Sequence, residues 1–265
     1  MIAAPCILFS TNSFTILHTN YPHNTLTNML FMYCRPFIVM ERLRDLSEIL
    51  NLSAQDKNPT LFKNKSFKYS EVLHLVRDLA VALRYLHGEV HQDATIIHRD
   101  IKPENLGLNP DGKLKLFDFG LCRCVKSRSD DTDMYEMTGN TGSLRYMAPE
   151  VVLGQPYTER VDVYSFGMIM WTMARNKSPF KGFDRAMHRS RVVLEGERPK
   201  MDPEWPSDFT LLLDACWHQD SDLRPPFTVI CDQLDKMIEA PSKDPTGLRT
   251  KAKGLSFLKS MFSKR

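Results

Sequence analysis

The most regular pattern of apolar and polar residues lies in residues 69–88, with the sequence YSEVLHLVRDLAVALRYLHG. Apolar residues recur there at intervals of three and four, which is the period of an amphipathic α-helix. These positions are Leu73, Val76, Leu79, Leu83 and Leu86. Ser70 is placed to cap the N-terminus, and Gly88 lies where a helix C-terminus prefers glycine. The pattern therefore predicts an amphipathic helix.

Upstream of this helix, residues 35–50 change from a strand pattern to a helix pattern. The run of β-type residues that favours a strand is Phe37, Ile38 and Val39. Apolar residues at helical spacing then follow at Leu43, Leu46, Ile49 and Leu50. Residues 51–68 are polar and include a proline, so we expect a strand, a connector, a helix and then a loop.

Further patterns follow downstream. Residues 109–120 place turn residues before an alternation of leucine and lysine, which predicts a β-hairpin. Residues 118–150 are rich in Ser, Thr, Gly and Asp without periodicity, as in a long functional loop. Residues 161–174 are apolar on nearly every side, which marks a buried helix. With helical faces also at 209–217 and 227–238, we expect a mainly α (α+β) fold.

Charge is distributed unevenly along the 265 residues. The chain is 42% hydrophobic and 25% charged, which is typical of one globular domain. The formal net charge is +3, yet residues 241–265 hold seven Lys or Arg against one Asp, which leaves −3 for the remainder. A mildly acidic folded part argues against nucleic-acid binding, so an electrostatic partner belongs to the basic end.

The cysteines and the uncharged N-terminal stretch bear on the cellular location. The six cysteines show no CxxC pair and no histidine spacing that would form a zinc site. Free thiols favour a reducing compartment, so we expect a cytoplasmic protein. Residues 1–34 contain no Asp, Glu, Lys or Arg, but their apolar runs are shorter than the roughly 18–20 residues that span a membrane. Because they also lack a basic start, no secretory signal is expected.

Three short motifs carry the chemistry. Residues 98–105 are HRDIKPEN, residues 118–120 are DFG, and residues 148–150 are APE. Their order and spacing resemble the signature set of protein kinases, in which phosphoryl transfer needs an orienting carboxylate, ligands for Mg²⁺ and positive charge on the phosphates. The resemblance extends over residues 37–238 and implies the hinge and the whole C-lobe of a kinase.

The resemblance implies roles for polar side chains around ATP and Mg²⁺. Asp100 would accept or orient the substrate hydroxyl, while Asn105 and Asp118 would coordinate Mg²⁺. Lys102 resembles the lysine that steadies the γ-phosphate in serine/threonine kinases. Ser143 lies where those kinases place a hydroxyl that contacts the catalytic loop. We therefore expect a protein serine/threonine kinase that phosphorylates Ser or Thr of a protein substrate.

The expected adenine site lies in the hinge segment FIVMERL. By resemblance, Met40 is the gatekeeper, and the backbone of Glu41 and Leu43 faces adenine. Gly107 stands where kinases often have a larger apolar side chain beneath the adenine, which removes contact area. Leu106 is expected to compensate for that loss.

Arg99 is expected near the activation loop, where a phosphate can pair with it and order the loop. The candidate phosphorylation sites are Thr138, Thr141, Ser127 and Ser129. The two threonines are favoured over the two serines, and solvated loop hydroxyls are the alternative for each residue.

Other residues resemble structural parts of the same family. Asp162 resembles the helix aspartate that bonds the backbone of the catalytic loop. Glu150 and Arg224 resemble the ion pair that ties the APE segment to the lower lobe. Residues 205–227, together with HRDIKPEN, point to the tyrosine-kinase-like group.

The parts that grip the nucleotide in kinases have no counterpart in the sequence. No glycine precedes Gly88, so a Gly-rich loop is missing. The first lysine is Lys57, already past the hinge, and the earliest acidic residue is Glu41. We therefore expect a truncated N-lobe and little or no kinase activity from this chain, since charge on the phosphates would lack support.

Two interpretations stay open. The retained Asp100, Lys102, Asn105 and Asp118 favour an active kinase represented by an incomplete chain. The alternative is a catalytically silent binding module that regulates or competes with an intact kinase.

The chain is expected to have three parts. They are an uncertain N-terminal segment at residues 1–34, the kinase-like domain at residues 35–240, and a basic tail at residues 241–265. The tail has apolar residues at helical spacing, at Leu255, Leu258 and Phe262. A basic amphipathic helix binds an anionic membrane or a partner, and a disordered basic end is the alternative.

Overall fold

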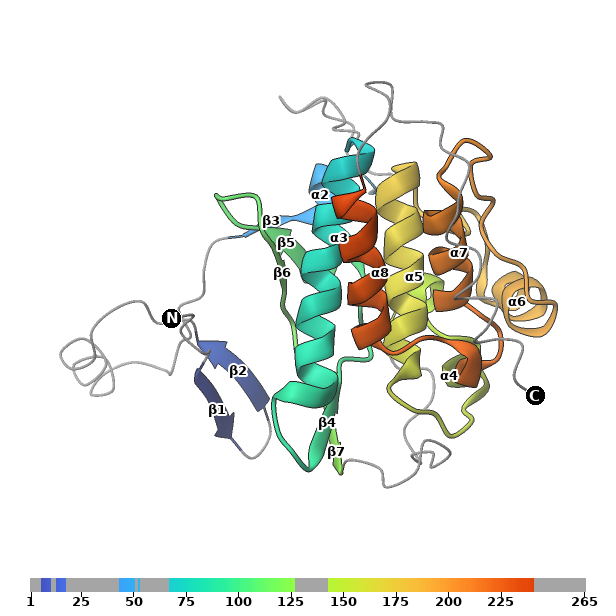
Figure 1. The fold of residues 1–265 in the computed structure, drawn as a ribbon. Helices are drawn as coiled ribbons and strands as arrows, with labels where there is room; N and C mark the ends of the chain where they lie inside the picture. Colours follow the sequence, from blue (N-terminus) through green and yellow to red (C-terminus); the bar gives the residue numbers. More distant parts are fainter. Residues whose placement is uncertain are drawn as a thin grey trace.

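The chain folds around a group of long helices, with small sheets beside them (Figure 1). The computed structural model describes the backbone of residues 6–10 and 13–17 and, with side chains, residues 43–50, 52, 67–126 and 143–240. The mainly helical content expected from the sequence is confirmed over these ranges. Within them, no helix combines the length and the hydrophobicity needed to cross a membrane.

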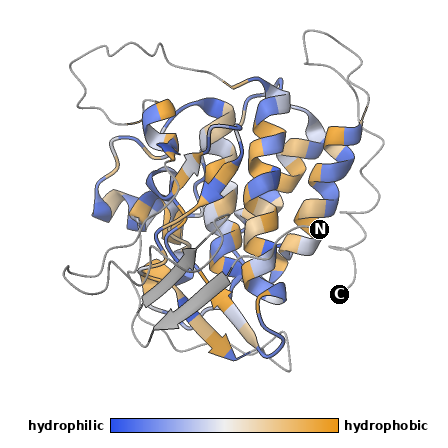
Figure 2. Cartoon of the chain, turned by 90° about the vertical axis from the view of Figure 1, so that its left-hand side faces the viewer, coloured by the Kyte–Doolittle hydropathy of each residue, from blue (hydrophilic) through white to orange (hydrophobic). Residues whose placement is uncertain are grey.

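The long helices are α3 (Tyr69–Arg84), α5 (Arg160–Arg175), α7 (Ser207–Cys216) and α8 (Phe227–Glu239). They lie side by side in Figure 1, where α3 packs against α5 and α8, and α5 packs against α7. Every residue from 161 to 173 of α5 is buried, which confirms the predicted buried helix. Figure 2 shows apolar and polar positions interleaved along the helices, as expected for helices that bury one side.

Shorter helical segments connect the long helices. They are α2 (Leu46–Ile49), α4 (Pro149–Leu153), α6 (Arg185–Met187), the π-helical η1 (Tyr85–Glu89) and η4 (His188–Leu194), and the 3₁₀ turns η2 (Pro103–Asn105), η3 (Leu144–Tyr146) and η5 (Ser221–Leu223). The helical pattern expected from Leu43 begins later, because Arg44 and Asp45 pair in a strand instead. The Asp45 side chain then caps α2 by accepting from Ser47 N–H at 2.6 Å.

The N-terminus of α3 differs from the prediction. The helix begins at Tyr69 with Lys68 at the N-cap position. There the Glu71 carboxylate accepts a hydrogen bond from Lys68 N–H at 2.8 Å. Ser70 lies inside the first turn, so the prediction that it caps the helix is wrong.

The C-terminus of α3 widens into η1 instead of stopping at glycine. Val90 N–H donates to Tyr85 O at 2.9 Å, which closes a turn of five residues. Gly88 lies inside this turn, so the prediction that Gly88 follows the helix end is wrong. The wider turn aims His87 toward α5, which matters for the site described below.

The strands form small antiparallel sheets. Their members are β1 (Cys6–Ser10) with β2 (Ser13–Leu17), β4 (Ala94–Ile97) with β7 (Arg123–Lys126), and β3 (Arg44–Asp45), β5 (Leu106–Leu108) and β6 (Leu114–Leu116) in the order β3-β5-β6. The predicted hairpin is confirmed, since β5 pairs with β6 around a turn in which Gly112 has φ +77°. The HRD loop joins β4 to β5 and the DFG loop follows β6, so the pairing brings both loops together.

The buried imidazole of His188 lacks hydrogen bonds to its ring. His188, at the start of η4, is 1% exposed, and neither of its ring nitrogens has a hydrogen-bond partner among the described residues. Its ring contacts Phe180 edge-on at 5.3 Å between centroids. Burial, together with the positive charges of Arg198 and Arg145, lowers the pKa of His188 to about 4.

We expect the protein to lose stability as the pH falls from about 6.5 to about 4. In this window the unfolded His188 takes up a proton, whereas the folded one stays neutral, so acid favours the unfolded state. The shift corresponds to roughly 3 kcal/mol of unfolding free energy. Urea unfolding at several pH values measures it. His188→Leu should flatten this dependence, whereas the same change at exposed His74 should not; equal pH profiles for both variants would contradict the assignment.

Candidate active site

The HRD loop is anchored by a buried carboxylate. Asp162, in the first turn of α5, is 0% exposed. It accepts hydrogen bonds from the backbone N–H of His98 at 2.8 Å and of Arg99 at 2.9 Å, and lies 2.9 Å from His87 Nε2. Burial alone raises the pKa of Asp162, but its bonds to His87 and to the loop backbone hold the pKa below its usual value. The predicted contact with the catalytic loop is confirmed.

Arg99 takes a strained conformation that aims its side chain at two other segments. Its φ is +67°, a region that residues other than glycine rarely adopt. Its Nε donates to Leu121 O at 2.7 Å, and its Nη1 donates to the hydroxyl of Tyr157 at 3.1 Å. Sequence reasoning missed Tyr157, because no motif connects it to Arg99. The expected phosphate acceptors Thr138, Thr141, Ser127 and Ser129 lie outside the described residues.

Asp100 is the centre of a cluster of polar side chains. Its Oδ2 lies 2.7 Å from Lys102 Nζ, and Asn105 Nδ2 donates to Asp100 O at 2.8 Å and to Oδ2 at 3.1 Å. Ser143 N–H donates to Oδ1 at 3.0 Å, so this contact uses the backbone and not the expected hydroxyl. Asp100 is 7% exposed, and the Lys102 side chain is 22% exposed. The structure thus brings together the three residues predicted to be catalytic, and their roles stay predictions.

The two predicted metal ligands flank the paired strands, since Asn105 directly precedes β5 and Asp118 follows β6. Phe117 N–H donates to Asn105 O at 3.1 Å, and Asp118 is the next residue in the chain. Asp118 has φ +60°, and its Oδ1 accepts from Gly120 N–H at 3.3 Å. The amide nitrogen of Asn105 is bound to Asp100, which leaves Oδ1 as the oxygen able to face a cation.

An amide and a carboxylate oxygen are hard donors, of the kind that Mg²⁺ accepts alongside phosphates and water. Across the described ranges, no group of three or more His, Cys, Asp or Glu is arranged to hold a metal by itself. The residues present therefore fit a cation that arrives together with a phosphate ligand.

His98 joins the two loops through its buried ring. It is 0% exposed and contacts Phe119 edge-on at 5.1 Å between centroids. Its Nε2 lies 3.3 Å from Phe117 O. Burial lowers the pKa of His98, so its ring acts as a neutral spacer between the HRD and DFG loops. From the sequence, His98 is identified only as part of the HRD motif, without a role of its own.

The expected adenine site contains a close contact at Gly107. A Cβ built at Gly107 would lie 2.7 Å from Leu43 Cβ and 3.2 Å from Arg44 O, so β3 approaches β5 too closely for a side chain there. Leu43 therefore packs where a larger side chain at position 107 would lie. The Leu106 side chain is 0% exposed, and its expected role beneath the adenine stays a prediction. The other hinge predictions, Met40 and Glu41, lie outside the described residues.

Gly107→Val is expected to destabilise the protein by about 1–3 kcal/mol, because the added side chain forces β3 and Leu43 to move. Thermal or urea unfolding measures the change. Gly88→Ala is the control, since a Cβ at Gly88 meets nothing within 4 Å. Equal stability of the two variants would show that β3 does not pack on β5 in this way.

The APE segment is tied to the lower part of the fold by a buried ion pair. Arg224 Nη1 lies 2.6 Å from Glu150 Oε1, and Nη2 lies 2.9 Å from Oε2. Arg224 is 1% exposed and Glu150 is 9% exposed. The predicted ion pair is confirmed, and it is bidentate.

Comparison with protein families matches residues 21–234 to the protein kinase domain. The match begins upstream of Arg35 and ends inside α8. All the residues of the Asp100 cluster lie inside the matched part.

Comparison with known proteins finds kinases of Dictyostelium discoideum and Arabidopsis thaliana among the relatives. A probable serine/threonine-protein kinase of Dictyostelium discoideum is 34% identical over 216 residues, 75% of this chain and 22% of that protein. Serine/threonine-protein kinase STY17 of Arabidopsis thaliana is 30% identical over 240 residues, 84% of this chain and 40% of that protein. Serine/threonine/tyrosine-protein kinase HT1 of the same plant is 34% identical over 186 residues, 69% of this chain and 45% of that protein. The chain thus spans less than half the length of each of these relatives.

Proposed function

Because this chain belongs to the protein kinase family, we propose that it is a serine/threonine kinase that transfers the γ-phosphate of ATP to proteins. The contact of Asp100 with Lys102 and Asn105 carries the proposal, because these groups suit transfer to a hydroxyl. The serine/threonine kinase names of the relatives support the acceptor class. The likeness of residues 205–227 and of HRDIKPEN to the tyrosine-kinase-like group supports placing the chain in that group.

We propose a task for each side chain. The carboxylate of Asp100 accepts the proton of the substrate hydroxyl, and Asn105 holds that carboxylate in place through Nδ2. The ammonium of Lys102, at 2.7 Å from Asp100, places positive charge where phosphate oxygens would lie. Asn105 Oδ1 and the Asp118 carboxylate would hold the cation, for which we propose Mg²⁺. Bound Mg-ATP would supply the phosphoryl group and neutralise the charge that develops on it.

A second candidate is a non-catalytic binding module that regulates another kinase. The observation that favours it is the absence of glycine before Gly88 and of lysine before Lys57 in this sequence. Residues 1–56 therefore cannot supply a Gly-rich loop or a phosphate-binding lysine. We propose that a chain without these groups transfers phosphate more slowly than the roughly 1–100 per second of ordinary kinases.

Thermal unfolding with and without Mg-ATP separates the two candidates. A ligand that binds only the folded protein at 100 times its Kd stabilises it by about 2.7 kcal/mol. The kinase proposal predicts this stabilisation, its loss in Asp118→Asn, and phosphate transfer to a serine or threonine peptide. Absence of both stabilisation and transfer would support the binding module.

The proposal also covers the cellular location of the protein and the contacts of its basic tail. Cys122, Cys124, Cys216 and Cys231 are free thiols, which supports a cytoplasmic location. The basic tail lies outside the described residues, and its contact with an anionic membrane or a partner stays a proposal. Liposome binding that is unchanged after replacing Phe257 and Phe262 with serine would refute membrane contact.

A further inference from the structure

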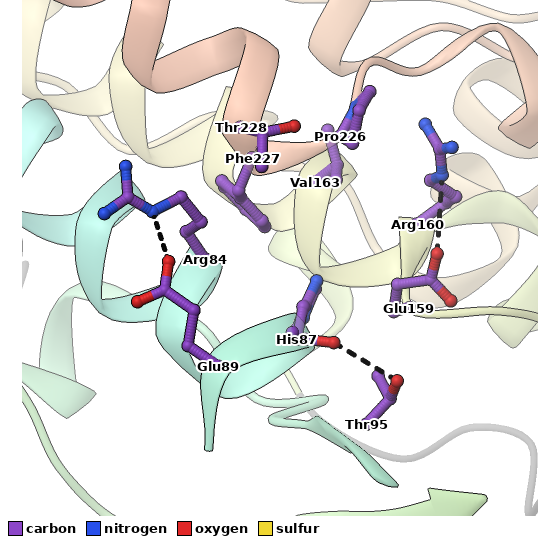
Figure 3. A pocket seen from close by; sticks show the side chains of 11 residues that line it. Arg84, His87, Glu89, Thr95, Glu159, Arg160, Val163, Pro226, Phe227 and Thr228 are labelled. Carbon is purple, nitrogen blue, oxygen red and sulfur yellow. Dashed lines mark hydrogen bonds and ion pairs between the residues drawn. The ribbon is translucent and has the colours of Figure 1, made fainter. Parts of the chain in front are cut away.

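A cavity of about 330 Å³ is lined by His87, the residue whose ring contacts Asp162. The end of α3 with η1 and the starts of α5 and α8 converge on it, as Figure 3 shows. Its volume falls in the range of pockets that hold small molecules. None of the residues expected to bind ATP or Mg²⁺ lines it, so it is separate from the candidate active site.

The floor of the cavity is apolar and partly aromatic. Val163 and Phe227 are buried there, and the His87 ring contacts Phe227 edge-on at 5.2 Å between centroids. Figure 3 shows these side chains between two charged walls. This floor suits the body of a flat or aliphatic molecule, because burying apolar surface is favourable.

The charged walls each carry an arginine. Arg84 Nε donates to Glu89 Oε1 at 2.8 Å, which leaves both terminal nitrogens of Arg84 without a partner among the described residues. The side chains of this pair are 34% and 48% exposed, so the pair contributes little to stability and can exchange partners. Across the cavity, Arg160 donates through Nη1 to Arg224 O, which fixes its position, and its Nε lies 3.6 Å from Glu159 Oε1.

We propose that this cavity binds a small organic anion, a carboxylate or phosphate on an apolar body. Arg84 would release Glu89 and form a bidentate contact with the anionic group, which guanidinium geometry favours. Arg160 would face the ligand from the opposite wall, and the apolar body would rest on Phe227 and Val163. The Glu89 and Glu159 carboxylates stay beside the arginines. Their negative charge disfavours the binding of multivalent polyanions such as nucleic acid.

The position of the cavity gives such a ligand a route to the catalytic loop. His87 lines the cavity, and its Nε2 lies 2.9 Å from the Asp162 carboxylate. The same carboxylate accepts hydrogen bonds from the backbone of His98 and Arg99. A ligand that contacts His87 is therefore separated only by the His87 side chain from Asp162, which positions the HRD loop.

Phenyl phosphate is the probe for this site, and inorganic phosphate tests the contribution of the apolar floor. Isothermal titration to the full chain should detect phenyl phosphate binding that is tighter than inorganic phosphate binding. Arg84→Gln should weaken the phenyl phosphate affinity by at least about tenfold, because it removes the bidentate donor. The imidazole NMR signals of His87 should shift during the same titration.

Arg77→Gln is the matched control. Arg77 lies on the same helix and pairs with Asp235 at 2.7 Å, with side chains 39% and 40% exposed, but it does not line the cavity. The Arg77→Gln variant should bind phenyl phosphate with the same affinity as the unchanged chain. Equal affinities in all three proteins, no binding at all, or unmoved His87 signals would each overturn the proposal. Because every measurement is of binding, the result is independent of the proposed kinase activity.

Discussion

Asp100→Asn is expected to lower phosphoryl transfer by roughly 100- to 10,000-fold, the range that a general base contributes. The amide keeps the size of the side chain but cannot accept the proton of the substrate hydroxyl. Its neighbours show why the position matters, since Lys102 Nζ and Asn105 Nδ2 both contact Asp100 Oδ2. Transfer of labelled phosphate from ATP to a serine or threonine peptide measures the loss.

Asp93→Asn is the control for this experiment. Asp93 is exposed and precedes β4, so the same chemical change there should leave the rate unchanged. Thermal unfolding of both variants verifies that they fold. If the unchanged chain transfers phosphate measurably, an Asp100→Asn protein of equal activity would rule out Asp100 as the base.

Arg224→Met is expected to destabilise the protein by about 3–5 kcal/mol, the cost of breaking one side of a buried ion pair. Arg224 is 1% exposed, and it binds both oxygens of Glu150. Methionine leaves the Glu150 carboxylate buried without its cation, and it also removes the 2.9 Å bond from Arg224 Nε to His218 O. Urea unfolding measures the free-energy difference.

The matched surface change is Arg77→Met. It also breaks an arginine–carboxylate pair, but the Arg77 and Asp235 side chains are 39% and 40% exposed. Water screens such a pair, so we expect a loss of only about 0–1 kcal/mol. Adding Glu150→Gln to Arg224→Met should recover part of the lost stability, because no charge is then left uncompensated. Similar losses for the two single variants would show that burial does not strengthen the Arg224 pair.

The sequence predicted the elements that are specified by residues close together in the chain. The apolar period of residues 69–88 located α3 and η1, and the unbroken apolar run of residues 161–174 located α5 as a buried helix. The HRD and DFG motifs pointed to Asp100 and Asp118, and the hairpin pattern between them was sufficient to bring their loops together. Each of these predictions depends on neighbours along the chain, which the sequence records directly.

Local rules failed where a contact from elsewhere competed with them. Ser70 is a good cap by residue type, yet Glu71 reaches back to Lys68 N–H and the helix begins earlier. No local pattern predicted that Leu43, next to β3, packs closely on Gly107 of β5. The reason is that such a contact depends on which strands pair and in which register.

By itself, the sequence determined the order of the helices, the composition of the HRD and DFG loops and the class of chemistry they resemble. How those loops are held depends on the tertiary structure. Asp162 accepts a hydrogen bond from His98, 64 positions away in the sequence, and the Tyr157 hydroxyl accepts one from Arg99, 58 positions away. The tertiary structure also buries the His188 ring, whose nitrogens have no hydrogen-bond partner among the described residues, and connects a cavity to Asp162 through His87. Polarity patterns specify which face of an element is buried, whereas a hydrogen-bond partner is chosen only when distant elements pack together.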